Sequence, residues 1–515
     1  MPSTLADRVA GWRPALDDAV RVATAPRLDE VGRVEHLGDG VAFVSGLPGL
    51  ALDELVRFAD GTLGLTVELA PHRASCLVLG PDHDLAAGGV VHGTGALARV
   101  PVGDGLLGRV VDPLGHPLDE AGPVEATRLE PVERPAPGIA DRDLVSEPLY
   151  TGVGVIDAMF PIGRGQRELI IGDRATGKTA IAVDAVLSQR ASDVVCVYVA
   201  IGQKSSSVAQ VIDAVRRHGP VERTVFVVAE AETAPGLQWL APYAGATIAE
   251  HVRDAGGHAL LILDDLTRHA AIHRQIALLL RQPPGREAFP GDVFHVHSRL
   301  LERAAKLAPR LGGGSLTALP IAETQAGNLS AFIPTNLISI TDGQIALDSR
   351  LFEEGQLPAV DVGKSVSRVG GKTQAPVMRD LAQHLRLEYA QALELEVFAR
   401  FGATADARTR SAVEHGHRIR ALLRQPRLAP LPVSVQVGQL LALARGILDR
   451  LSPEGVTRFR TAMPNRLRRD APRIVDGLDQ GAELGADDAD ALARVLDALA
   501  SEVASPAPET AAGAG

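Results

Sequence analysis

The sequence predicts a multidomain chain with an N-terminal β-barrel, a central α/β domain and a C-terminal α-helical domain. Three changes of pattern predict it: period-two alternation over residues 28–94, apolar runs that alternate with helical patterns over 95–374, and helical periodicity over 375–503. A chain of 515 residues is also too long for one ordinary core.

The first and last residues carry weaker patterns. Within residues 1–27 the apolar positions Leu5, Val9, Trp12, Leu16 and Val20 fall on one helical face, although Pro14 should kink or split that helix. Such a helix either docks on its own body or receives a partner. Residues 504–515 are rich in Pro, Ala and Gly and are expected to be disordered.

The segment 28–94 has the pattern of short β-strands. Leu63, Leu65, Val67 and Leu69 alternate with other residues, and glycines near 38–40 and 88–89 mark turns. A small β-barrel or sandwich is predicted, and the barrel is the fold that we assign.

The central domain is predicted to contain a parallel sheet covered by helices. The apolar runs 168–171, 194–201, 225–228 and 259–263 are its expected strands. After residue 374 apolar residues recur every fourth position, namely Leu381, Leu385, Tyr389, Leu393, Val397 and Phe401. Ser434 is predicted to cap a second long helix.

Composition excludes several classes of function. The net charge of -11 argues against nucleic acid as a main partner. The two cysteines, Cys76 and Cys196, lie in apolar runs, so buried thiols in a reducing compartment are expected rather than a disulfide framework. No long apolar run or leader pattern occurs, so we expect a cytosolic chain that reaches a membrane only through other subunits.

A glycine loop joins the first expected strand to a helix. Its spacing G-x-x-x-x-G-K-T turns backbone N–H groups toward phosphate oxygens, while Lys178 reaches the outer phosphates and Thr179 supplies a hydroxyl to Mg²⁺. The alternative is an ordinary turn, which the strand, the helix and the scarcity of lysine, five in the chain, all disfavour. A P-loop (RecA-like) nucleotide-binding domain is predicted, with the binding residues Gly172, Asp173, Arg174, Ala175, Thr176, Gly177, Lys178 and Thr179.

The second half of a magnesium–nucleotide site is a carboxylate at the end of a neighbouring strand. Asp264 follows the apolar run 259–263 and is the predicted partner of Thr179 at the metal. An acid at a strand end is more often a helix cap, so this assignment depends on the glycine loop.

The catalytic base of a hydrolytic site is not evident. The strand 194–201 is followed by Gln203, whose amide cannot take a proton, and Asp265 is the nearby alternative. The sequence therefore predicts a chain that binds nucleotide better than it cleaves it.

Taken together, these motifs resemble the alpha subunits of F-type ATP synthases. The resemblance is carried by the loop 172–179, by residues 198–204 and 281–294, and by the segment 365–370, and it covers nearly the whole chain. In that family a glutamine stands where the beta subunit has its catalytic glutamate, and Gln203 matches it. Arg368 matches the arginine finger that is inserted into the neighbouring beta subunit's site; by itself it would be read as a solvated loop charge.

The resemblance implies a set of partners and ligands. It implies an alternating hexamer of three alpha and three beta subunits, a gamma subunit as central stalk, and a delta subunit or peripheral stalk that meets the N-terminal helix. It also implies tightly bound ATP or ADP with Mg²⁺, and a peripheral location on the cytoplasmic face of the bacterial membrane. The transported ion, proton or sodium, and the direction of the reaction do not follow from this chain.

The sequence departs from the family pattern around one pocket. Ala175 replaces a glutamine of the loop, Leu357 replaces an arginine before Pro358, and Gln425 and Arg427 represent a glutamine pair near the adenine. We expect looser nucleotide binding or altered base preference. Residues 371–374 also differ, which suggests a divergent branch such as an alternate bacterial ATPase.

Three other readings are weaker. A self-sufficient homohexameric ATPase would need a catalytic glutamate in each subunit, which Gln203 opposes. An RNA-translocating hexamer is disfavoured by the acidic charge and by an aromatic content of 3%. A scaffold without nucleotide leaves Lys178, Thr179 and Asp264 unexplained.

Overall fold

The computed structural model describes residues 30–400 and 407–504. The predicted N-terminal helix over 1–27, Phe401 and residues 505–515 of the predicted tail lie outside the described residues. Contacts divide the chain into one unit up to Leu97 and a second from Ala98 onward.

The first unit is a closed six-stranded antiparallel barrel, as predicted. Its strands follow the order β1-β2-β5-β4-β3-β6 around the barrel. The strands are β1 (Val31–Gly38), β2 (Val41–Ser45), β3 (Glu54–Phe58), β4 (Leu63–Ala70), β5 (Arg73–Val78) and β6 (Val90–Leu97). Strand β6 runs three residues past the predicted boundary at 94, so the barrel takes in residues up to 97.

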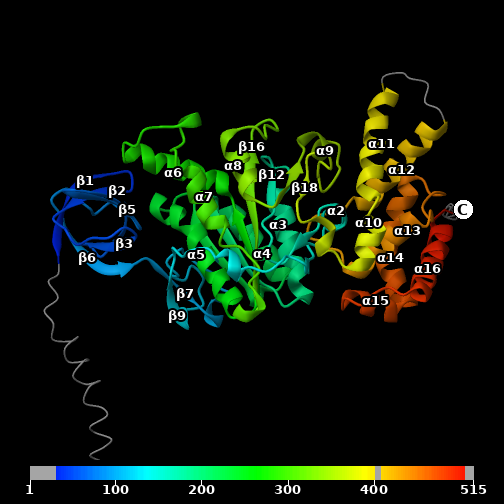
Figure 1. Cartoon of the computed structure of the whole chain (residues 1–515), viewed down its shortest axis with the longest axis horizontal. Helices are drawn as coiled ribbons and strands as arrows, with labels where there is room; N and C mark the ends of the chain where they lie inside the picture. Colours follow the sequence, from blue (N-terminus) through cyan, green and yellow to red (C-terminus); the bar gives the residue numbers. More distant parts are fainter. Residues whose placement is uncertain (1–29, 401–406, 505–515) are drawn as a thin grey trace, which may run out of the picture. The chain divides into compact units, whose positions relative to one another are not determined.

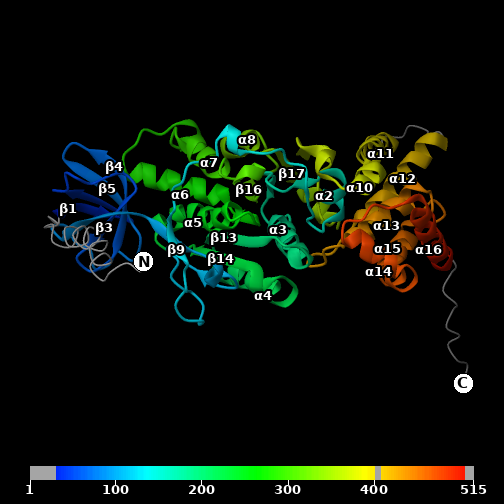
Figure 2. The same ribbon diagram turned by 60° about the horizontal axis from the view of Figure 1, so that its bottom comes forward.

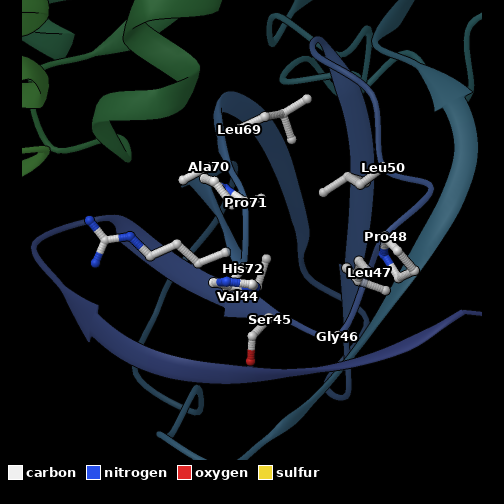
Figure 3. A pocket seen from close by; sticks show the side chains of 12 residues that line it. Val44, Ser45, Gly46, Leu47, Pro48, Leu50, Leu69, Ala70, Pro71 and His72 are labelled. Carbon is white, nitrogen blue, oxygen red and sulfur yellow. The ribbon is translucent and has the colours of Figure 1, made fainter.

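The barrel closes around a small apolar core. Buried side chains of β1, β2, β3, β5 and β6 fill it, among them Val34, Val44, Val56, Cys76 and Val91. Burial raises the pKa of the Cys76 thiol to about 12, as expected for a reduced core residue. A separate hollow of about 320 Å³ lies between the 44–50 and 69–74 segments (Figure 3).

The second unit contains an eight-stranded sheet of order β18-β17-β12-β16-β15-β13-β14-β8. All of its neighbours pair in parallel except β17 and β18. Its strands are β8 (Val110–Val111), β12 (Leu169–Asp173), β13 (Val195–Gln203), β14 (Thr224–Glu230), β15 (His258–Asp264), β16 (Ser315–Thr324), β17 (Gly343–Leu347) and β18 (Val366–Ser367). The four predicted strands are confirmed as β12, β13, β14 and β15, whereas β8, β16, β17 and β18 were not predicted.

Helices cover this sheet because the strands are apolar on both faces. Helix α5 packs along β13 (Figure 2) and also contacts β15, whereas α3 packs against α4. The helices of this part are α2 (Gly154–Met159), α3 (Lys178–Ser188), α4 (Ser205–His218), α5 (Pro235–Asp254), α6 (Leu266–Leu279), α7 (Val293–Leu301), α8 (Phe332–Ile340) and α9 (Ser349–Glu353). Two short ribbons complete it: β7 (Arg99–Val102) with β9 (Arg128–Pro131), and β10 (Pro148–Leu149) with β11 (Ile162–Gly163).

The C-terminal part is helical, as predicted (Figure 1). Its helices are α10 (Pro376–Ala382), α11 (Leu385–Arg400), α12 (Ala407–Leu423), α13 (Val433–Ala444), α14 (Pro453–Asp470), α15 (Pro472–Asp479) and α16 (Ala486–Ala504). Within the described ranges, no helix combines the length and the hydropathy that a membrane span requires.

The prediction that Ser434 caps a helix is wrong. Ser434 lies inside α13, which Pro432 precedes as N-cap residue. The backbone N–H and the hydroxyl of Ser434 donate to the carboxylate of Asp479 at the end of α15, at 2.8 and 3.1 Å. A side chain distant in sequence therefore caps α13, which no local pattern could reveal.

Candidate nucleotide site

The glycine loop lies between β12 and α3, at the carboxyl edge of the parallel sheet. Gly177 immediately precedes α3 with a φ of 101°, and Ala175 has a φ of 63°. A Cβ at Gly172 would lie 2.9 Å from the Cβ of Leu347 and 3.0 Å from the Thr176 hydroxyl. The glycines at 172 and 177 are thus required by close packing and by a left-handed backbone.

Lys178 is buried at the start of α3. Its ammonium donates to the backbone carbonyls of Gly172 at 3.0 Å and of Asp173 at 2.7 Å. Burial lowers the pKa of Lys178, and the charge of Glu323 is the largest influence that opposes this shift. The loop thereby holds a cation at its own centre, where a phosphate group needs one.

The loop opens into a pocket of about 570 Å³. One end is formed by residues 174–179 together with the carboxyl ends of β13, β15 and β16. The opposite end is formed by residues from α3, from the 352–358 segment and from the 425–427 segment: Asp184, Phe352, Leu357, Pro358, Gln425, Pro426 and Arg427. The volume is in the range of sites that bind small organic ligands.

Asp264 lies at the end of β15 and accepts three side-chain hydrogen bonds. Thr179 Oγ1 donates to Oδ2 at 2.9 Å, the Tyr198 hydroxyl donates to the same oxygen at 2.6 Å, and Gln203 Nε2 donates to Oδ1 at 3.0 Å. Burial raises the pKa of Asp264, while the bonds from Tyr198 and Thr179 and the charge of Lys178 act in the opposite direction. A carboxylate beside a threonine hydroxyl is an oxygen donor set that fits Mg²⁺.

The sequence left open whether Asp264 caps the following helix. The structure shows that Asp265 is the residue that caps α6. Its carboxylate accepts from the backbone N–H of Arg268 at 2.7 Å and begins α6. Burial, with the neighbouring charge of Asp264, raises the pKa of Asp265 to about 7. Asp265 therefore has a structural partner of its own.

Glu323 lines the same end of the pocket and was missed by the sequence reading. It lies on β16 opposite Gly172 of β12. Its strand was not recognised because Thr317, Pro320 and Thr324 interrupt the apolar run. The available signal for this site residue was its position: Glu323 is an acid one residue before the end of a mainly apolar run, and Gln325 and Gly327 follow that run.

The side chain of Asp173 turns away from the pocket. It accepts from Thr324 Oγ1 at 2.6 Å, from the Gly327 N–H at 2.8 Å and from Ser349 Oγ at 3.0 Å. Burial raises its pKa, but these bonds prevail and hold the pKa of Asp173 below its ordinary value. The predicted binding residue Asp173 thus contributes its backbone to the loop and its carboxylate to the loop's support, whereas Arg174 is exposed and lines the pocket.

The amide of Gln425 is occupied by the backbone. Its Nε2 donates to the carbonyls of Gly152 and Ala429, both at 2.8 Å, and its Oε1 accepts from the Gly154 N–H at 3.1 Å. Gln425 therefore shapes this end of the pocket by holding the 425–429 segment. The second predicted residue, Arg427, is exposed and lines the pocket.

Arg368 lies outside this pocket. It follows β18, and its guanidinium donates to the carbonyls of Thr341 at 2.9 Å and Ile338 at 3.1 Å, at the carboxyl end of α8. Arg368 is exposed, and the buried Glu168, whose pKa burial raises well above its usual range, lies within its electrostatic reach. A cation at a helix C-terminus is favourably placed, and its exposure leaves it accessible to another molecule.

Comparisons with known proteins identify the family. The model of the "ATP synthase alpha/beta family, nucleotide-binding domain" matches residues 152–367, and that of the "ATP synthase alpha/beta chain, C terminal domain" matches 374–499.

Named relatives extend the match over most of the chain. "ATP synthase subunit alpha 1" of Paraburkholderia xenovorans (strain LB400) is 60% identical over 447 residues, which are 87% of this chain and 88% of that protein. "ATP synthase subunit alpha 2" of Burkholderia pseudomallei (strain 1710b) is 58% identical over 481 residues, which are 93% and 72% of the two chains. The chain, with its glycine loop, its parallel sheet and its helical C-terminal part, belongs to the ATP synthase alpha/beta family, among the alpha subunits.

Proposed function

We propose that this chain is the regulatory, non-catalytic nucleotide-binding alpha subunit in the soluble sector of a rotary F-type ATP synthase. It would bind ATP or ADP with Mg²⁺ and hold it without hydrolysis. The complex would couple ATP synthesis or hydrolysis to the transport of protons or sodium ions at the cytoplasmic face of a bacterial membrane.

The observation that carries the proposal is the hydrogen bond from Gln203 to Asp264. A hydrolytic site needs a carboxylate that orients or deprotonates the attacking water. Here the end of β13 presents an amide that donates to the metal-binding acid at 3.0 Å. Of the nearby acids, Asp265 is engaged as a helix cap, and Glu323 supports the charge of Lys178. The site therefore favours binding over cleavage.

Different residues would bind the phosphates and the metal. Lys178 and the N–H groups at the start of α3 would hold the phosphates, and Thr179 and Asp264 would hold the metal or its water ligands. Bound Mg²⁺ would neutralise phosphate charge. The apolar Leu357 and Pro358 would contact the base.

We further infer that Arg368 acts in a second subunit. It does not line the pocket of its own chain, and it is exposed. Inserted into a neighbouring beta subunit's site, its guanidinium would stabilise charge on the transferring phosphoryl group. The alternating hexamer of three alpha and three beta subunits, the gamma central stalk and the peripheral stalk are the corresponding partners, the last through residues 1–27.

Three changed polar contacts are expected to loosen nucleotide binding or to alter the base preference. Ala175, Leu357 and Arg427 stand at positions where the family carries other polar groups, and Ala175 and Leu357 offer no hydrogen bond from their side chains. The phosphate grip of Lys178 is retained.

Titration of the full chain with MgATP tests the proposed binding. Wild type should bind saturably, and Lys178→Ala should weaken binding by about 10- to 100-fold, because one charged hydrogen-bonding group is worth roughly 1.5–3 kcal/mol. The matched control is Lys204→Ala, an exposed lysine that does not line the pocket. Equal affinities for the three proteins would contradict a nucleotide site at the loop.

A further inference from the structure

Arg368 is held at both its side chain and its backbone by the turn 338–342. Its guanidinium donates to the carbonyls of Ile338 and Thr341, and its backbone N–H donates to the carbonyl of Asp342 at 2.8 Å. These three acceptors lie at the end of α8 and just before β17. The position of the guanidinium therefore depends on the shape of this turn.

Arg167, two residues before β12, binds the side chain of Asp342. Its Nε donates to Oδ2 of the carboxylate at 3.0 Å, its Nη2 donates to Oδ1 at 2.8 Å, and its backbone N–H donates to Oδ2 at 3.0 Å. The backbone N–H of Asp342 donates in return to the carbonyl of Arg167 at 2.8 Å. A guanidinium that binds both carboxylate oxygens fixes the orientation of the pair as well as its distance.

The Arg167–Asp342 pair joins the amino ends of two neighbouring core strands. The strands β12 and β17 pair in parallel, with Leu169 opposite Gln344. The two charged side chains are only 14% and 29% exposed, and Arg167 also pairs with Glu302 after α7. Neither member of the pair lines the nucleotide pocket, which lies at the opposite, carboxyl edge of the sheet. The proposed binding of nucleotide therefore gives this pair no task.

We propose that Arg167 is a positioning residue for Arg368. Through the carboxylate of Asp342 it holds the turn whose carbonyls aim the Arg368 guanidinium. This inference rests on the proposed role of Arg368 in a neighbouring beta subunit's site, and it names the residue that sets the finger. Arg167 itself would touch neither the nucleotide nor the transferring phosphoryl group.

A fixed turn matters because the finger must be in place before the transition state forms. Donors that are already oriented stabilise developing charge without any reorganisation during the reaction. A misplacement of about 1 Å can cost about 100-fold in rate. Without the Arg167 side chain, the two donors that orient the Asp342 carboxylate are lost, and the turn is free to move.

Turnover of reconstituted complexes that carry Arg167→Met, Arg368→Ala or both tests the proposal. Arg167→Met keeps the length of the side chain and removes its donors, and it should lower kcat for ATP hydrolysis by about 10- to 100-fold. The double variant should be no slower than Arg368→Ala alone, because Arg167 acts only through Arg368. Arg167→Lys should recover part of the loss, since an ammonium keeps the charge but not the two parallel donors.

The matched control is Arg164→Met. Arg164 is buried to a similar degree, 18% exposed, and it pairs with Asp193 instead of the turn. Its complex should turn over within about twofold of wild type. Titration of each full chain with MgATP should give wild-type affinity for all variants, which shows that the fold and the chain's own pocket are kept.

The outcomes separate this inference from the proposed function. If Arg368→Ala slows turnover and Arg167→Met does not, Arg167 has no positioning role while that of Arg368 stands. Losses that multiply in the double variant would also overturn the inference, because Arg167 would then act elsewhere. If Arg368→Ala turns over normally, the proposed role of Arg368 itself fails. Should Arg167→Met not fold or assemble, Asp342→Asn takes its place in the same comparison with the same expected results.

Discussion

At the scale of single residues, two polar side chains give the pocket its proposed character. Gln203 presents an amide nitrogen where a catalytic carboxylate would present an oxygen, and this nitrogen donates a hydrogen bond to Asp264. Arg368 is held on the carbonyls of Thr341 and Ile338, outside its own pocket. Binding and assistance in catalysis would thus be separated within one chain.

Replacement of Arg368 should cripple the assembled complex. Arg368→Ala is expected to lower the rate of ATP hydrolysis by about 10³- to 10⁵-fold, the range found for arginine fingers, because the transition-state charge loses its partner. Arg368→Lys should also lose most of the rate, because an ammonium cannot present two parallel donors. Steady-state turnover of reconstituted complexes measures the effect.

The same variants provide their own control. Nucleotide affinity of the full chain should stay within about twofold of wild type, since Arg368 does not line the pocket. The role of Arg368 would be refuted by a variant complex with normal turnover.

The titration of Asp184 should appear in the pH dependence of stability. Burial raises its pKa to about 7 in the folded chain, whereas an unfolded aspartate titrates near 3.8. The folded state therefore binds more protons between these values, and the group's contribution to the free energy of unfolding falls as pH rises from about 4 to 7. Asp184→Asn, which cannot ionise, should lose less stability over this window, by roughly 1–3 kcal/mol.

Denaturant unfolding at pH 5, 6, 7 and 8 measures this difference. Wild type and variant should diverge progressively as the pH rises. Parallel curves for the two proteins would show that Asp184 titrates normally. Asp193→Asn is a suitable control, because Asp193 is more exposed and its pKa lies below the ordinary value.

At the scale of elements, carboxylates from distant parts of the sequence stabilise loops and helix ends. Asp173 joins β12 to the end of β16 and to Ser349. Asp479 closes the first turn of α13 from the end of α15. These contacts tie together segments that are far apart in sequence.

Loss of the Asp479 cap should destabilise the helical part modestly. Asp479→Ala removes the acceptor for the N–H and hydroxyl of Ser434, which should cost about 1 kcal/mol, as for other caps. The midpoint of urea unfolding, followed by circular dichroism, reports it. Asp476→Ala on the same exposed side of α15 should have a smaller effect, and equal losses in both variants would argue against a cap.

The sequence predicted the elements whose signals are local. The glycine spacing and apolar strands located β12, α3 and the ends of β13 and β15, because strand ends of a parallel sheet converge on one edge. It missed β16 and therefore Glu323, since polar residues and Pro320 interrupt that strand. It missed Asp184 because the backbone groups that meet it come from residues 428 and 429. The resemblance placed Gln425 near the adenine, whereas its bonds to Gly152 and Gly154 form only in the folded chain and have no local pattern.

At the scale of the whole molecule, the chain divides into two compact units, and the nucleotide pocket lies in the second. The barrel closes its own core, and the second unit contains the entire pocket from the loop to residue 427. Nucleotide binding is therefore expected of the full chain before assembly. The rotary function would arise only with the other subunits.

The central claim is that the site binds nucleotide without cleaving it. The most direct measurement is a single-turnover experiment: the full chain, in excess over γ-labelled MgATP and at a concentration that binds it, is followed for released phosphate. The account predicts that bound ATP is recovered intact over many minutes. Phosphate release at about 1 s⁻¹ or faster, within the ordinary range of enzymes and abolished by Lys178→Ala, would contradict it.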